Sequence, residues 1–163
     1  MKALLARRPI ATSGRRRLGS FVSTQPKEAL VAMQTAPLTR EQLAALPHSY
    51  FRAVDAKDID AILSHFADDA TLTVQTDHAV FSGADEIRRM FTDFCEGSTS
   101  IFHEIKNIVV EPEARKVATE QSYIGELVDG TKNDMHNCNF FDVDAEGKFS
   151  RVIIWMAGTN PLK

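Results

Sequence analysis

The chain has 163 residues, enough for one domain with a single core and too few for two ordinary domains. Its composition, 44% hydrophobic and 25% charged, is that of a globular protein, and no apolar run approaches the roughly 20 residues of a membrane helix. The net charge of −3 is uneven, because residues 1–26 hold six basic and no acidic side chains and the remainder carries −9. An acidic body argues against nucleic acid, whose phosphates attract clustered Lys and Arg. We expect no nucleic-acid or membrane partner.

The residue patterns that hold metals and cofactors are missing from the sequence. Cys95 and Cys138 form no CxxC pair and no disulfide framework, so both thiols are expected to be reduced. The chain has no His-Glu-x-x-His motif, no acidic calcium loop, no phosphate-binding Gly-rich loop and no nucleophile elbow. We therefore expect neither a metal site nor a cofactor, and a serine hydrolase has no support.

Residues 1–35 form an arm that we set apart from the fold. Its first 26 residues are rich in Arg, Ser and Thr and lack acids, which is typical of a mitochondrial presequence. Two other interpretations stay open: a disordered tail, or an extension upstream of a natural start at Met33. The protein is accordingly expected to be cytoplasmic, or mitochondrial if the arm is a presequence, with one domain over residues 36–163.

Three helices are predicted between residues 39 and 96. Thr39 is a suitable N-cap, with Gln42 completing a capping box, and Asp58 begins a second, short helix. The third helix follows two short strands, at residues 70–76 and 79–81. The apolar stripe of the first helix is Leu43, Leu46, Tyr50 and Val54, and that of the third is Ile87, Met90, Phe91 and Phe94.

From residue 101 onward the hydrophobic pattern has period two. It predicts four long strands, at residues 101–110, 116–127, 134–143 and 149–157. The turns between them are short and rich in Gly, Asp and Pro, so the strands form an antiparallel meander. Three helices followed by such a sheet indicate an α+β domain.

This order of elements resembles the nuclear transport factor 2-like superfamily and its SnoaL-like domains. The similar segments are Asp55–Val74, which joins a helix to the first strand, Phe81–Phe91, which opens the third helix, and the last hairpin, Asp144–Gly158. The resemblance covers about Leu38–Lys163. It implies a cone-shaped domain, three N-terminal helices packed on a strongly curved, mostly antiparallel sheet, with a pocket for a small, largely apolar molecule. This fold hosts isomerases, cyclases, dehydratases and binding modules, so it does not name the reaction.

Two comparisons within the superfamily restrict the chemistry. SnoaL-like cyclases use a carboxylate near the end of the last strand as a base, and Ala157 at the matching place cannot accept a proton. The similarity to the scytalone dehydratase branch is partial. His103 matches the first catalytic His of that branch, and Asn137 or Asn139 matches its Asn, but the second His has no counterpart here.

Strand alternation selects the residues that should face the pocket. Glu104 and Lys106 prefer water, which places His103 inside; Asp142 prefers water, which places Asn137 and Asn139 inside. On the last strand we place Ile153, Trp155 and Ala157 on the pocket side. The outer face then holds His136, Cys138, Phe140, Val152, Ile154 and Met156.

His103 is the candidate acid or base, since a neutral imidazole can exchange a proton at physiological pH. Asn137 and Asn139 are candidates to hold a substrate oxygen, and Asp55 to orient a water as part of the catalytic set. The remaining candidate substrate-binding residues are Tyr50, Tyr123 and Trp155. Each has a structural alternative: a core His, amides paired across the sheet, a solvated Asp and aromatic core residues.

Two functions follow. The first is a cofactor-independent lyase or isomerase, dehydratase-like, acting on a small cyclic or aromatic molecule. The second is a non-catalytic binding or assembly module of the same fold, dimerising through the outer face of its sheet. A carboxylate within hydrogen-bond reach of His103 would favour catalysis, and an isolated His103 would favour binding.

Overall fold

A computed structural model describes residues 37–158, 161 and 162. The predicted arm, residues 1–35, lies outside the described residues, and its interpretation as a presequence stays a prediction.

All three predicted helices form, and capping side chains mark the start of the first two. α2 (Arg40–Asp55) begins after Thr39, whose Oγ1 accepts from the Gln42 backbone N–H at 3.2 Å while the Gln42 side chain accepts from the Thr39 N–H at 2.8 Å. Asp58 caps α3 (Ile59–Leu63) by accepting from the Ala61 N–H. α4 (Gly83–Glu96) buries its predicted apolar stripe. The predicted helices are confirmed. Helix caps could be predicted from the sequence because they depend on contacts between residues close together in the chain.

Six strands form one sheet in the order β2-β1-β6-β5-β4-β3. The strands are β1 (Phe66–Val74), β2 (Ala79–Ser82), β3 (Ser98–Glu111), β4 (Lys116–Leu127), β5 (Lys132–Val143) and β6 (Phe149–Trp155). Strands β3 to β6 are the predicted antiparallel meander, and β1 joins β6 in parallel. β1 starts earlier than predicted, at Phe66, because an irregularity before Thr71 interrupts its alternation.

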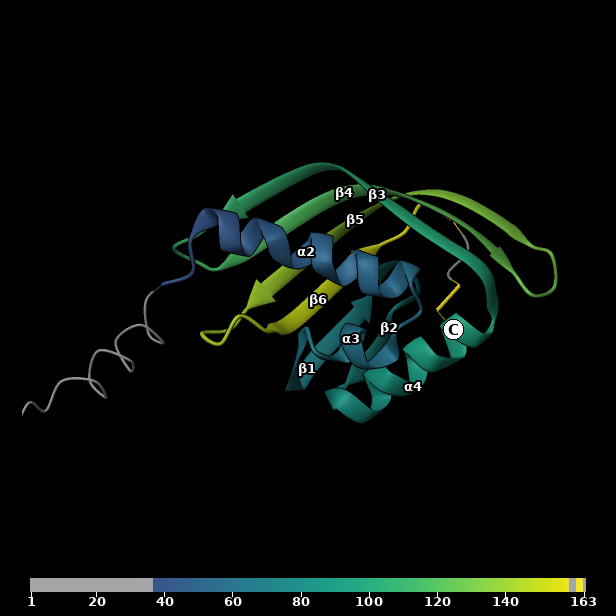
Figure 1. Ribbon diagram of the computed structural model, residues 1–163, viewed down its shortest axis with the longest axis horizontal. Coiled ribbons are helices and arrows are strands. Elements are labelled where there is room, and N and C mark those ends of the chain that lie inside the picture. Colours follow the sequence, from purple (N-terminus) through teal and green to yellow (C-terminus); the bar gives the residue numbers. More distant parts are fainter. Residues whose placement is uncertain (1–36, 159–160, 163) are drawn as a thin grey trace, which may run out of the picture. The chain divides into compact units, whose positions relative to one another are not determined.

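The sheet curves around the first helix. Figure 1 shows β3, β4 and β5 bending over α2, with α4 packed against β1. The core fills the concave side, where the ring of Tyr50 meets several phenylalanine rings, including those of Phe91, Phe141 and Phe149. The predicted class, three helices on a strongly curved, mostly antiparallel sheet, is confirmed.

Candidate active site

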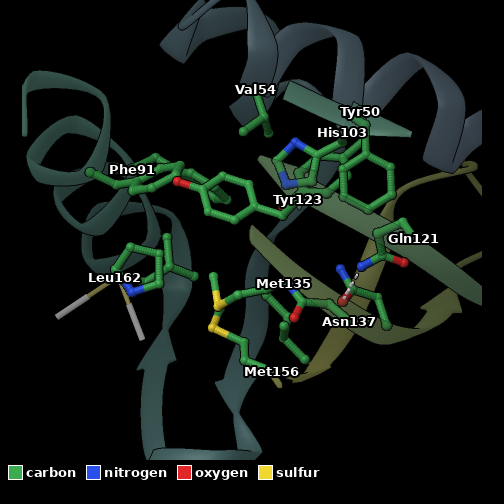
Figure 2. Close-up of a pocket in the computed structure, with 15 residues that line it drawn as sticks. Tyr50, Val54, Phe91, His103, Gln121, Tyr123, Met135, Asn137, Met156 and Leu162 are labelled. Atoms are coloured by element: carbon green, nitrogen blue, oxygen red, sulfur yellow. Dashed lines mark hydrogen bonds between the residues drawn. The ribbon is translucent and has the colours of Figure 1, made fainter. Parts of the chain in front are cut away.

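A pocket opens on the concave side of the sheet, between α2, α4 and the inner faces of β3 to β6. The space between its atoms is about 410 Å³, counting the open mouth, but the centre of a water molecule can reach only about 30 Å³ of it. Apart from the open mouth, that leaves room for a water or two between the lining side chains. The lining residues are Tyr50, Phe51, Val54, Phe91, Phe94, His103, Gln121, Tyr123, Met135, Asn137, Asn139, Ile154, Met156, Pro161 and Leu162, ten of which are labelled in Figure 2.

His103 and Asp55 form a hydrogen-bonded pair at one wall of this pocket. Asp55 is the last residue of α2, and its Oδ1 lies 2.7 Å from the Nδ1 of His103 while its Oδ2 accepts from the His103 backbone N–H at 3.1 Å. The side chains are 10% and 23% exposed, so water competes only weakly for the contact. A carboxylate accepts and does not donate, so Nδ1 carries the hydrogen and the neutral ring keeps its lone pair on Nε2.

Two aromatic rings hold the imidazole in place. Phe51, one turn before Asp55 on α2, stacks on it with ring centres 4.7 Å apart, and Tyr123 lies beside it at 5.1 Å. Figure 2 shows His103 next to the Tyr123 ring inside the pocket. The ring therefore has little freedom to rotate, which keeps Nε2 available to a pocket ligand.

Tyr123 brings an unpaired hydroxyl to the same pocket. The residue is 2% exposed, and its Oη makes no hydrogen bond within the described part of the chain. Burial, followed by the nearby charge of Asp55, raises the pKa of Tyr123, so the hydroxyl keeps its proton. A buried hydroxyl without a partner costs about 1–3 kcal/mol, and a ligand oxygen would remove that cost.

A row of amides on β4 and β5 forms the polar part of the wall. Thr119 donates to the Oε1 of Gln121 at 2.7 Å, and the Nε2 of Gln121 donates to the Oδ1 of Asn139 at 2.9 Å. The Oδ1 of Asn137 accepts from the backbone N–H of Ala157 at 3.2 Å. Both predicted asparagines line the pocket, and neither pairs with the other.

Tyr50 also lines the pocket, as predicted, but its environment is apolar. Its ring is 2% exposed and lies edge-on to Phe66, Phe91 and Phe149. Burial raises the pKa of Tyr50, with a smaller contribution from Cys95. The hydroxyl is therefore neutral at physiological pH.

The orientation predicted for the last strand is wrong. Trp155 is 51% exposed and lies on the outer face of β6 with Ile153, while Val152 and Ile154 are buried. Residues 152–156 are all apolar, so their alternation does not say which face is inward. Arg151 pairs with Asp142 on the outer side and marks the true direction.

Several pocket residues were not predicted from the sequence. Gln121 shares the inner face of β4 with Tyr123, a parity that was available in the pattern. Phe51 precedes Asp55 by one helical turn, and its role depends on a long-range contact. Pro161 and Leu162, which come after β6 in the chain, also line the pocket, and no local pattern in the sequence indicates this.

Residues 37–158, 161 and 162 contain neither a candidate metal site nor a candidate membrane helix. They contain no group of three or more His, Cys, Asp or Glu placed to hold a metal ion. No helix in that part of the chain has the length and apolar character needed to cross a membrane.

Comparison with known proteins places this pocket in a family. No curated protein sequence matches the chain. Among solved structures, it is similar to a proposed aromatic ring hydroxylase from Novosphingobium aromaticivorans (25% identity, TM-score 0.68, 76% of this chain and 96% of that one). It is also similar to the BvnE pinacolase from Penicillium brevicompactum (18%, 0.65, 72% and 87%). A third is the epoxide hydrolase/cyclase-like enzyme SalBIII of pyran ring formation in salinomycin (19%, 0.65, 72% and 92%).

The last two similarities show the fold alone. The family model of the SnoaL-like domain matches residues 48–152, most of the described chain, and this range includes α2 from its middle onward and most of the pocket wall. The chain therefore belongs to the SnoaL-like domain family.

Proposed function

We propose that the protein is a cofactor-independent lyase or isomerase acting on a small, largely apolar cyclic or aromatic molecule. The observation that carries this proposal is the His103–Asp55 pair, joined at 2.7 Å inside an apolar pocket. An imidazole held by a carboxylate at Nδ1, with a free Nε2 facing a ligand site, has the arrangement of a general base.

In the proposed reaction His103 moves one proton. Nε2 takes a hydrogen from a substrate carbon, and the electron pair of the broken C–H bond stays on the substrate. The imidazolium that results is stabilised by Asp55, which becomes its counter-ion. His103 then returns the proton, either to a second carbon, which gives an isomer, or to a leaving oxygen, which gives an eliminated product. The protein and the proton count are restored in both cases.

Asn137 or Asn139 is proposed to hold the substrate oxygen. Asn137 and Asn139 are at most 4% exposed, and their amides face the same pocket as the imidazole. N–H and O–H donors in a dry site stabilise negative charge on a carbonyl oxygen more strongly than water does. The base lies on β3 rather than at the end of the last strand, where Ala157 stands.

The pocket has to open for such a ligand. The side chains that leave only about 30 Å³ for water include Met135, Met156 and Leu162. Methionine adapts readily to a new neighbour, since its chain is unbranched and flexible. When these side chains move aside, an apolar ligand ring would take their place and pack against the aromatic residues of the pocket.

Proton exchange tests the proposal without knowledge of the natural substrate. The protein would be incubated with 1-indanone and with 2-tetralone in deuterated buffer, and loss of the hydrogens next to the carbonyl would be followed by NMR. His103→Ala should slow the exchange by about two orders of magnitude or more. The control is His136→Ala, because His136 is exposed on the opposite face and pairs only with Glu120. Exchange that is equal in wild type and His103→Ala would contradict the proposal.

The second candidate is a non-catalytic binding or assembly module, and the observation that favours it is the outer face of the sheet. Exposed apolar side chains cluster there on β3, β4, β5 and β6: Phe102, Val109, Ile124, Phe140 and Trp155. We propose that this face joins two copies of the chain in a homodimer, since monomers seldom leave such area in water. Dimerisation is compatible with either function, and ligand binding without proton exchange would select the second.

A further inference from the structure

Hydrogen-bond direction on the amide wall restricts what the pocket can recognise. The backbone N–H of Ala157 can only donate, so the Asn137 atom that faces it at 3.2 Å must be the oxygen. The Nδ2 of Asn137 is thereby the group left to donate to a ligand. Asn137 is 4% exposed and lines the pocket, so its amide nitrogen is a donor at the pocket surface.

The neighbouring groups have the same polarity. The Oδ1 of Asn139 accepts from Gln121, and the Oε1 of Gln121 accepts from Thr119, so the protein itself already uses both oxygens. This side of the pocket therefore offers donors to a ligand and engages its own acceptors internally.

The imidazole side of the pocket has the reverse polarity. In the neutral ring, Asp55 accepts the Nδ1 hydrogen of His103, which leaves Nε2 as an acceptor. Tyr123 lies beside this ring, and its hydroxyl lies over Gly125. The pocket thus offers an acceptor at His103 and a donor at Asn137.

We propose that the ligand is a cyclic ketone, bound with its carbonyl oxygen at Asn137, and that the pocket selects it against the corresponding alcohol. This inference rests on the proposed function for the assignment of the pocket as the ligand site. A ketone oxygen only accepts and so meets the donors fully. An alcohol at the same place brings its own hydrogen next to amide oxygens that each already accept one hydrogen bond, so this hydrogen finds a weaker partner than the ketone oxygen does.

The test compares 1-indanone with 1-indanol, which have the same ring and differ at the oxygen. Calorimetric titration of the full chain should show 1-indanone binding about tenfold more tightly than 1-indanol. In Asn137→Asp a carboxylate oxygen replaces the amide nitrogen, so the preference should vanish or reverse. Asn107→Asp, which adds the same charge at an exposed position of β3 outside the pocket, should keep the preference.

A second variant keeps the test decisive if Asn137→Asp fails to fold. Asn137→Leu has similar volume and no donor, and it should bind the ketone and the alcohol equally. Equal binding of the two compounds by wild type, an unchanged preference in both Asn137 variants, or no saturable binding of 1-indanone would overturn the inference.

The outcome is separable from that of the proposed function. A ketone preference without proton exchange would leave the recognition rule standing and remove the catalytic role of His103. Proton exchange without any preference between ketone and alcohol would support the catalytic role of His103 and contradict the proposed ketone selectivity.

Discussion

Asp55 decides what the His103 imidazole can do. Both of its carboxylate oxygens bind the same residue, one through the backbone N–H and one through Nδ1. This double contact orders the ring and sets its tautomer, so Nε2 is the basic nitrogen. A water or a backbone carbonyl could also accept from Nδ1, but neither would become a counter-ion for the imidazolium.

Asp55→Asn should therefore lower the rate of proton exchange by at least tenfold while the protein stays folded. The amide has one acceptor oxygen for two donors, so one of the His103 contacts is lost or the ring adopts the other tautomer. Exchange rates and thermal melting would be measured side by side. Asp60→Asn is the control, since the Asp60 carboxylate lies outside the pocket and forms an exposed pair with Arg88. A rate equal to that of wild type would show that Asp55 has no part in the chemistry.

Tyr50 links stability to alkaline pH. Burial raises its pKa, so the folded state keeps the phenol proton that the unfolded chain loses near pH 10. A raised folded pKa means that the stabilisation is complete below pH 10 and declines as pH rises further. The free energy of unfolding should thus fall above pH 10 in wild type and fall less in Tyr50→Phe. Urea unfolding at pH 8 and pH 11 measures this, and parallel losses in both proteins would contradict it.

On β4, Gly125 makes room for the ring of Tyr123. A Cβ at position 125 would lie 2.3 Å from the Tyr123 Oη and 3.0 Å from the backbone oxygen of Ser100. The Tyr123 side chain therefore lies along its own strand over a residue without a side chain. This arrangement, together with the alternation of β4, keeps the ring beside His103.

Gly125→Ala should displace Tyr123 and destabilise the fold by about 1–3 kcal/mol, the usual cost of overpacking. Unfolding by urea would measure the loss. Tyr123→Leu removes the clashing hydroxyl, so Gly125→Ala should cost less in that background, and the difference gives the coupling between the two residues. Additive effects would mean that the strand backbone at Ser100, and not the ring, limits the space.

For the protein as a whole, the outer sheet face predicts assembly. Phe140 is 47% exposed in the centre of that face, next to Trp155. Light scattering at micromolar concentration should give the mass of a dimer, and Phe140→Glu should give that of a monomer. Val128→Glu is the control, because Val128 is still more exposed, at 70%, and lies in the turn after β4 instead of on this face. A monomeric wild type would count against the homodimer.

The arm over residues 1–35 is predicted to be dispensable for folding, because its composition is too polar to add a core of its own. A chain shortened to begin at Met33 retains the Thr39 cap and every element from α2 onward. It should melt within a few degrees of the full chain. A large loss of stability would show that the arm contributes to the domain.

Much of the fold could be predicted from the sequence, because the signals for it lie between residues close together in the chain. Thr39 and Gln42 cap a helix through contacts three residues apart, and Asp58 does the same for α3. The meander follows from period-two alternation and short turns. Where a charged residue marked the wet face, as Glu104 does beside His103 and Asp142 does on β5, the alternation also predicted the pocket side correctly.

The rest depends on contacts between distant segments. The run Val152–Met156 is apolar on both faces, so the pairing of Arg151 with Asp142 across the strands was needed to turn Trp155 outward. Asp55 and His103 are 48 positions apart, and their contact exists because β3 bends over the end of α2. The direction of the Asn137 amide likewise depends on the N–H of Ala157, which belongs to the segment after β6. Alternation assigns a residue to a face, whereas hydrogen-bond partners are selected by the curvature of the whole sheet.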